Sequence, residues 1–236
     1  MPAGPSFGAS CALPRGMHSW DLTPKEAVAL QRELAGRVER DDRLGLVTRV
    51  AGVDVSYHAA SGRLAAAAVV LDAGTLQVMD VQIVLGEPVF PYVPGLFSFR
   101  ELPPVLAALE KLSAAPDLIV CDGQGIAHPR RFGLACHLGV WTGLPTIGCA
   151  KTRLTGTHEM PGESRGSRAA LMDKGEEIGA VLRTRDGVAP VYVSTGHRVS
   201  LETACAWVLR LAPRYRLPET TRIADRLVGE ALRDGP

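Results

Sequence analysis

The sequence lacks the features that define several classes of protein. Its formal net charge is only +1, which by itself indicates nothing about binding partners. The five cysteines are odd in number and form no C-x-x-C pair, so neither a disulfide framework nor a zinc ribbon is supported. No apolar run reaches membrane-spanning length, and no basic segment followed by an apolar run opens the chain. We therefore expect a cytoplasmic protein that does not bind membranes.

What is present is the composition of a globular domain. Hydrophobic residues make up 46% of the 236 positions and charged residues 22%, which is typical of folded soluble proteins. The length suits one domain with a substantial core. Residues 1–20 are rich in Pro, Gly and Ser, and we predict a flexible segment there. Residues 21–236 show no internal repeat and are predicted to form a single domain.

The order of the predicted elements indicates an α/β fold, with a mixed sheet flanked by helices. Three β-branched-rich runs joined by short turns favour an antiparallel meander. A Thr23-Pro-Lys-Glu26 capping box and helical spacing predict the first helix. The predicted strands are 47–57, 64–71, 76–85, 117–121, 145–150, 178–184 and 191–194, the last two forming a hairpin pair. The predicted helices are 24–40, 99–112 opened by Ser98, 130–143, 201–211 and 220–233, with a flexible insertion at 158–175.

The most informative stretch is Asp122-Gly-Gln-Gly-Ile-Ala-His-Pro-Arg-Arg131, which follows a short apolar strand. Its glycines allow a sharp turn and close approach of a ligand. Asp122 can hold a hard cation, while His128, Arg130 and Arg131 can face phosphate. The region 121–155 also contains Lys151 and Arg153, with Asp122 as its single acid, which suits a local phosphate contact. The alternative is a glycine turn followed by a solvated basic helix start.

Two further acids lie in unusual positions. Asp54 lies inside an apolar strand, where a charge is costly unless it is paired or bound to a metal; the alternative is a solvent-facing position on an edge strand. Glu101 lies near a predicted helix start, where an acid commonly just complements the helix dipole. Convergence of Asp54 and Asp122 at one sheet edge would favour magnesium or manganese over zinc. Such a cation suits phosphodiester hydrolysis, because it polarises the phosphoryl oxygen.

Residues 87–95 contain three prolines and cannot form regular structure. They predict a rigid loop that carries Tyr92 between Pro91 and Pro94.

Taken together, these motifs give the chain a family resemblance. From about residue 22 to 233 it resembles endonuclease V, a family of metal-dependent deoxyinosine-repair nucleases with a ribonuclease H-like fold. Any one motif is modestly specific, whereas the full set in order at the family's spacing is very specific. The matching stretches are Gly52-Val-Asp-Val-Ser-Tyr57, Pro91-Tyr-Val-Pro-Gly-Leu-Phe-Ser-Phe-Arg-Glu101, Asp122–Arg131, Pro145-Thr-Ile-Gly-Cys-Ala-Lys151, Val191-Tyr-Val-Ser-Thr-Gly-His197 and Arg216-Leu-Pro-Glu-Thr-Thr-Arg-Ile-Ala-Asp225.

The resemblance implies a site for Mg²⁺, for which Mn²⁺ can substitute, and it assigns the catalytic residues. The family's metal-site acids fall on Asp54, Glu101 and Asp122, and a fourth position falls on Asp225, whose alternative is an ordinary surface acid of a helix. Lys151 is implied to contact the scissile phosphate, the alternative being a simple pair with Asp122.

The resemblance also implies how the substrate is held. The Pro91-Tyr92-Val93-Pro94 loop corresponds to a wedge that fills the gap left by the flipped lesion base. A tight base pocket would reject the exocyclic amino group that distinguishes guanine from hypoxanthine. His128 has the alternative of hydrogen-bonding the site loop. The implied pocket residues are Gly95, Leu96, Gly123, Gln124, Gly125, His128 and Leu154, and the predicted phosphate contacts are Arg130, Arg131 and Arg153.

The implied activity is hydrolysis of the second phosphodiester bond on the 3′ side of deoxyinosine in damaged DNA, by a monomer, with 3′-hydroxyl and 5′-phosphate products. Three alternatives stay open. In the first alternative, the substrate is inosine-bearing RNA or another deaminated or distorted strand. The site residues do not decide this, because 2′-hydroxyl contacts depend on backbone geometry. In the second, the protein is a lesion- or RNA-binding module that does not cleave. In the third, the substrate is a small phosphate ester, which would make no use of an aromatic wedge.

Overall fold

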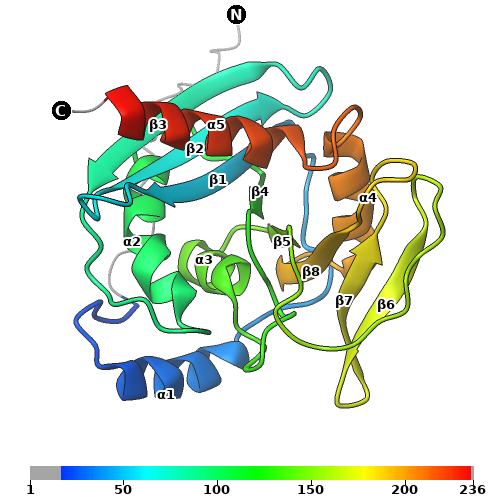
Figure 1. The fold of residues 1–236 in the computed structure, drawn as a ribbon, viewed down its shortest axis with the longest axis horizontal. Helices are drawn as coiled ribbons and strands as arrows, with labels where there is room; N and C mark the ends of the chain where they lie inside the picture. Colours follow the sequence, from blue (N-terminus) through cyan, green and yellow to red (C-terminus); the bar gives the residue numbers. More distant parts are fainter. Residues whose placement is uncertain (1–16, 235–236) are drawn as a thin grey trace, which may run out of the picture.

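The computed structural model describes residues 17–234, in which eight strands form one sheet with helices on both faces (Figure 1). The strand order is β3-β2-β1-β4-β5-β8-β7-β6. The strands are β1 Arg49–Tyr57, β2 Leu64–Asp72, β3 Val78–Gly86, β4 Leu118–Cys121, β5 Thr146–Ala150, β6 Arg168–Asp173, β7 Glu176–Leu182 and β8 Val191–His197. The helices are α1 Pro24–Ala35, α2 Phe97–Leu109, α3 Leu134–Thr142, α4 Leu201–Leu211 and α5 Glu219–Asp234.

The pairing of the strands confirms the predicted mixed sheet. β1, β2 and β3 form the antiparallel meander, while β4 and β5 run parallel to β1 and to each other. β8 and β7 then pair antiparallel, which confirms the predicted hairpin. The prediction of a flexible insertion at 158–175 is wrong in its second half, because 168–173 form β6 against β7. As an edge strand with mixed exposure, β6 has no apolar period that the sequence could display.

Alternation along β1 divides its side chains between the two faces of the sheet. Val53 packs in the cluster that contains α2 and α3, whereas α5 lies over β1 and β2 on the opposite face (Figure 1). Gly52 allows this close approach, because any Cβ at that position would overlap the backbone of Thr220. Asp54, two residues on, shares the face of Gly52. The tight contact therefore places Asp54 beneath α5.

Three helices differ from the predictions, and the one predicted over 130–143 is α3, which begins only at Leu134 and leaves Arg130 and Arg131 in the loop before it. The capping box at Thr23 and Glu26 is present, but α1 ends at Ala35 before Gly36 instead of continuing to residue 40. Ser98 does not open α2, which begins at Phe97 without a side-chain cap. Ser98 is instead buried, with its hydroxyl 3.0 Å from His137 Nδ1. None of the helices within residues 17–234 combines the length and apolarity needed to cross a membrane.

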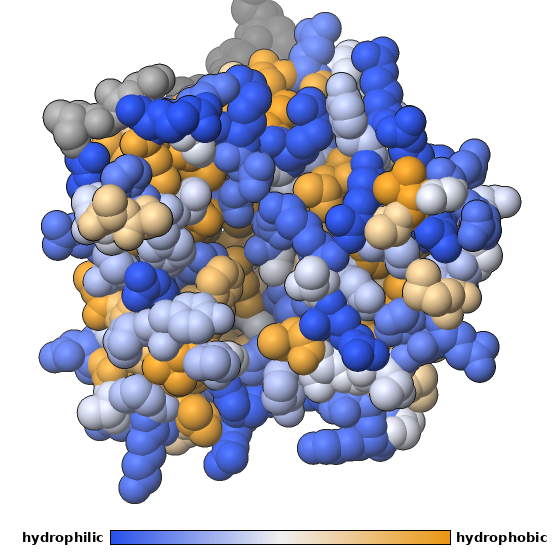
Figure 2. All heavy atoms as spheres, in the orientation of Figure 1, coloured by the Kyte–Doolittle hydropathy of each residue, from blue (hydrophilic) through white to orange (hydrophobic). Residues whose placement is uncertain are grey.

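The last four residues of the predicted flexible segment are packed against the domain. The rings of Trp20 and Trp141 lie 4.8 Å apart, and His18 Nε2 lies 2.8 Å from His137 Nε2. Met17 contacts the apolar cluster around α3. The rest of that predicted segment, residues 1–16, lies outside the described residues. Elsewhere the visible face is mainly hydrophilic, with apolar side chains in small groups (Figure 2).

Candidate metal centre and adjoining pocket

Three carboxylates from distant parts of the chain converge at one edge of the sheet. Asp54 lies on β1, Asp122 directly follows β4, and Asp225 lies on α5. One oxygen from each lies within 4.8 Å of the others. Parallel pairing of Val53 with Cys121 brings the first two acids to the same edge. The predicted convergence of Asp54 and Asp122 is therefore present in the structure, and α5 adds Asp225 to it.

Electrostatics at this cluster favour a bound cation. Burial, together with the charges of Asp122 and Asp225, raises the pKa of Asp54 to about 7, against the opposing effect of Lys151. Carboxylates this close repel one another when all are ionised, so a positive ion stabilises the charged set. An all-oxygen set of hard ligands fits a divalent cation such as Mg²⁺ or Mn²⁺. The donor chemistry of the cluster is consistent with a divalent metal site.

Glu101, the other predicted metal-site acid, lies outside the set of three converging oxygens but close enough for the charges of Asp54 and Asp122 to act on it. Its residue is only 3% exposed, and the Tyr57 hydroxyl donates a 3.4 Å hydrogen bond to its carboxylate. Burial and the charge of Asp54 raise the pKa of Glu101 well above its usual range. Its position beyond the first turn of α2 contradicts the alternative of a simple dipole acid. The edge-strand alternative for Asp54 is also wrong, because β1 lies between β2 and β4.

Lys151 bridges two of the acids. Its Nζ lies 2.6 Å from Asp122 Oδ2 and 3.1 Å from Asp225 Oδ1. Burial alone would lower the pKa of Lys151, but the contacts with Asp122 and Asp225 raise it. The pair with Asp122 that the sequence left as an alternative is therefore present. The ammonium is half-buried at the edge of the carboxylate cluster, next to the cavity that Lys151 helps to line.

A cavity of about 380 Å³ adjoins Asp122 and is open to solvent. It is walled by the proline-rich loop, the glycine loop after β4 and the segment after β5. Of the predicted pocket residues, Gly95, Gly123, Gln124, His128 and Leu154 line it. Leu96 and Gly125 do not line it. Leu96 is buried against Phe99, and Gly125 packs against the backbone of Thr195, where any Cβ would overlap.

The wall around Gly95 is held by a hydrogen-bond network. The Gly95 carbonyl accepts from Gln31 Nε2 at 3.0 Å, from His128 Nε2 at 3.0 Å and from Arg130 Nη2 at 2.6 Å. His128 Nδ1 accepts from the Arg130 amide, which assigns the imidazole proton to Nε2. Gly95 has φ +77°, and a Cβ there would lie 2.7 Å from Arg130 Nη2. Burial, and then the charge of Arg130, lowers the pKa of His128 to about 4.

This network answers the question that the sequence left open for His128, which does hydrogen-bond the site loop. Gln31 is a site residue that the sequence reasoning missed. It is 1% exposed and also donates to the Phe132 carbonyl at 3.0 Å. The available signal was a polar residue on the apolar stripe of the first helix, between Ala27 and Leu34.

The three predicted phosphate-contact arginines differ in their surroundings. Arg131 forms ion pairs with Asp173 at 2.8 Å and Glu176 at 2.7 Å, so its guanidinium fastens the site loop to the β6–β7 hairpin. Arg130 is likewise engaged with Gly95. Both guanidiniums therefore hold the site loop in place, and their phosphate contacts stay predictions. Arg153 is exposed and lines the cavity beside Asp122.

The proline-rich loop presents its aromatic side chain to solvent. Tyr92 is 71% exposed, and it lines the cavity together with Val93 and Pro94, whereas Pro91 does not. The loop is anchored on its flank by Phe90, which is buried and whose carbonyl accepts from Arg100 Nη1 at 2.7 Å. A large exposed aromatic on an anchored loop is available for stacking with a ligand.

Gln124 leaves one polar atom without a partner. Its Nε2 donates to the Thr152 carbonyl at 2.9 Å, but its buried Oε1 has no hydrogen-bond partner among the residues the structure describes. An unpaired buried acceptor is costly. Gln124 lines the cavity, but this oxygen is itself buried.

Comparison with known proteins matches this geometry to one family. The family model described as Endonuclease V matches residues 32–226. Endonuclease V of Streptomyces coelicolor is 56% identical over 227 residues, covering 95% of this chain and 96% of that protein. The crystal structure of Endonuclease V from Streptomyces avermitilis superposes with a TM-score of 0.87 at 54% identity, covering 96% of this chain and 99% of the other.

A more distant relative was solved with nucleic acid bound. Endonuclease V of Ciona intestinalis, in complex with a 24mer DNA containing an inosine followed by a ribo-adenosine, superposes with a TM-score of 0.77 at 28% identity. The match covers 89% of this chain and 97% of that one. These neighbours confirm the ribonuclease H-like fold that the resemblance implied. With the family model matching most of its length, the chain belongs to the endonuclease V family.

Proposed function

We propose that this protein is a Mg²⁺-dependent endonuclease that acts as a monomer in the cytoplasm on DNA containing deoxyinosine. It hydrolyses the second phosphodiester bond on the 3′ side of the lesion and leaves 3′-hydroxyl and 5′-phosphate ends. The observation that carries the proposal is the convergence of Asp54, Asp122 and Asp225 within 4.8 Å beside an open cavity. The Ciona relative bound to inosine-containing DNA supports the choice of substrate.

Each acid has a separate part in holding the cation. Asp54, Asp122 and Asp225 would supply carboxylate oxygens, and the buried Glu101 would support the site from below. When bound, the cation polarises the phosphoryl oxygen and activates water. Lys151, already at the mouth of the cluster, is placed to exchange an aspartate contact for the scissile phosphate. Its positive charge then offsets charge that develops during phosphoryl transfer.

The adjoining cavity would hold the lesion base. The fixed wall at Gly95 and the loop residues Gly123 and Gln124 make a rigid pocket, which can discriminate by rejecting an exocyclic amino group. Tyr92 would stack in the gap that base flipping leaves, a contact worth ~1–3 kcal/mol.

Inosine-containing RNA is a second candidate substrate. The strand bound to the Ciona relative carries a ribo-adenosine directly after the inosine, so a ribonucleotide at that position is compatible with the fold of a relative. Competition between matched DNA, RNA and chimeric oligonucleotides, each with one inosine, would rank the substrates by kcat/KM.

The deciding experiment is a nicking assay on an end-labelled duplex with one deoxyinosine. Wild type in Mg²⁺ should produce one nick at the second bond on the 3′ side, and EDTA should abolish it. The Asp122→Ala variant should produce none, while Tyr92→Ala should lose activity through KM. A duplex left intact by the wild type, or nicked equally by Asp122→Ala, would overturn the proposal.

A further inference from the structure

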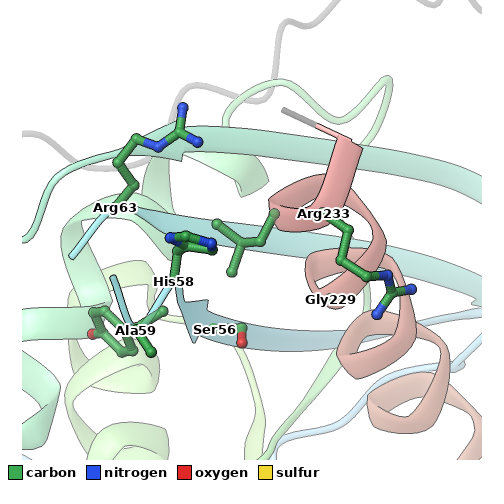
Figure 3. A pocket seen from close by; sticks show the side chains of 8 residues that line it. Ser56, His58, Ala59, Arg63, Gly229 and Arg233 are labelled. Atoms are coloured by element: carbon green, nitrogen blue, oxygen red, sulfur yellow. The ribbon is translucent and has the colours of Figure 1, made fainter. Parts of the chain in front are cut away.

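A second groove leads away from the metal centre, between the end of β1 and α5. It encloses about 540 Å³, and none of the residues that line it is acidic. Figure 3 shows His58 between Arg63 and Arg233, with Ser56 and Gly229 nearby on the strand and the helix. The lining residues that matter here are Ser56, His58, Arg63, Gly229, Leu232 and Arg233.

The groove is lined by the same strand and helix that carry two acids of the cluster. Ser56 follows Asp54 by two residues and shares its face of β1, and Gly229 follows Asp225 by one helical turn. At ~3.3 Å per residue, His58 lies about 13 Å along the strand from Asp54. At 1.5 Å per residue, Arg233 lies about 12 Å along α5 from Asp225. His58 and Arg233 therefore lie at about the same distance from the metal centre, one along the path of β1 and the other along α5.

The basic groups in the groove are available to a ligand. Within residues 17–234, neither Arg63 nor Arg233 forms an ion pair with the described side chains. The Ser61 amide donates to His58 Nδ1 at 3.3 Å, which leaves the proton on Nε2 as a donor. Arg226, on the same helix, is by contrast paired with Glu230 at 3.0 Å.

Gly229 has no structural reason to be glycine. A Cβ at this position would meet only Arg233 Nη1, at 3.7 Å. Glycine inside a helix costs ~1 kcal/mol relative to alanine, and here no close packing requires it. Its effect on the described structure is to keep the floor of the groove open between Ser56 and α5.

We propose that this groove binds the sugar–phosphate backbone of the nucleic-acid strand on the 3′ side of the scissile bond. At ~3.4 Å of helix axis per nucleotide, the basic end would meet the third or fourth phosphate beyond the metal centre. The direction rests on the proposed function, in which the lesion base occupies the cavity over β4 and β5. The groove lies on the β1 side of the centre, away from that cavity, and so receives the strand that leaves the lesion.

Binding of a fluorescent, lesion-free 20-nucleotide DNA, measured by anisotropy in EDTA over a range of salt, tests the groove without cleavage. The double variant Arg63→Gln/Arg233→Gln should bind more weakly and lower the salt dependence of log K by about 1 for each arginine. Arg226→Gln, on the same helix, should match the wild type. Equal affinity and slope in the double variant would overturn the proposal.

Gly229 supplies a test that does not depend on removing arginines. Gly229→Glu places a negative charge in the groove at a position where any side chain favours the helix, so it should weaken DNA binding without loss of folding. Gly229→Ala is the matched control and should bind as the wild type does. A Gly229→Glu variant with unchanged affinity would contradict the assigned site.

Nicking of deoxyinosine strands with 2 or 10 nucleotides beyond the cleaved bond tests the direction. Wild type should have the lower KM for the long 3′ flank, and the double variant should lose that preference while keeping kcat. If KM depended on the length of the 5′ flank and not on that of the 3′ flank, the assignment would be overturned. If wild type nicks neither strand, the proposed function fails, and the binding comparison still decides whether the groove holds the backbone.

Discussion

The carboxylate cluster and the wall around Gly95 are neighbouring regions that differ in how far their polar groups are satisfied by other protein groups. At the wall, the Gly95 carbonyl accepts three hydrogen bonds and His128 uses both ring nitrogens. At the cluster, three aspartates within 4.8 Å share one partly buried lysine. The hydrogen bonds of the wall are complete without a ligand, whereas the cluster has one ammonium group for three carboxylates. The difference indicates that the shape of the cavity is fixed before a ligand binds, whereas the carboxylate cluster needs a bound cation to balance its charge.

The largest expected effect comes from removing one charge of the cluster. Asp54→Asn should lower the rate of nicking by about 10³-fold, or ~4 kcal/mol, because a ligand of the cation is lost. In EDTA the same variant should melt at a higher temperature than wild type, because like-charge repulsion is relieved. Nicking assays and calorimetry on the same protein would check both effects.

Asp117 is the matched control for that variant. It lies at the other end of β4, where its carboxylate accepts from the amides of Thr48 at 2.8 Å and Arg49 at 2.9 Å. Asp117→Ala should cost about 1–2 kcal/mol of stability and leave kcat unchanged. A metal-free Asp54→Asn protein less stable than wild type would contradict the comparison.

The stability of metal-free protein should respond to pH through Asp54. Its pKa of about 7 lies above the ordinary value of 3.8, so the folded state binds the extra proton between these values. Stability should therefore fall as pH rises from about 4 to 7, by about 4 kcal/mol at most at ~1.36 kcal/mol per pH unit. Denaturant titrations in EDTA should show this fall in wild type and a smaller one in Asp54→Asn. Saturating Mg²⁺ should reverse it.

The wall should respond to pH with the opposite sign. The pKa of His128 is lowered from 6.5 to about 4, so the unfolded state binds the extra proton in that range. This contribution to stability is present above pH 6.5 and is lost as pH falls to 4, by about 3 kcal/mol at most. His128→Gln can keep one donor and one acceptor without titrating. The difference between wild type and this variant should grow in favour of the variant on acidification, and a difference independent of pH would contradict the assignment.

The smallest expected effect is at the backbone of the wall. Gly95→Ala places a side chain at φ +77° and 2.7 Å from Arg130 Nη2, which should cost about 1–2 kcal/mol of stability. Because the wall shapes the cavity, KM for a deoxyinosine strand should rise more than kcat falls. Gly62→Ala, at φ +71° but with open space around it, is a control for backbone strain alone. Equal KM values in the two variants would show that the wall does not shape the pocket.

Much of the site was predictable because its signals are local. A charge such as Asp54 inside an apolar strand has few physical explanations. The same is true of Asp122, which lies at a strand end and is followed by glycines. Apart from β6, the order of strands and helices, and the hairpin of β7 and β8, also followed from short-range patterns. These inferences hold because side-chain periodicity and turn chemistry act over a few residues.

Only the tertiary structure decided which partners those residues meet. It showed Arg131 bound to Asp173 and Glu176 rather than free, Ser98 buried against His137 rather than capping a helix, and β6 inside a stretch without periodicity. By itself, the sequence determined the kinds of element and the acids that need a cation. The pairing of groups tens of residues apart depends on packing and on the burial that follows from it, and neither is encoded in any local window of the chain.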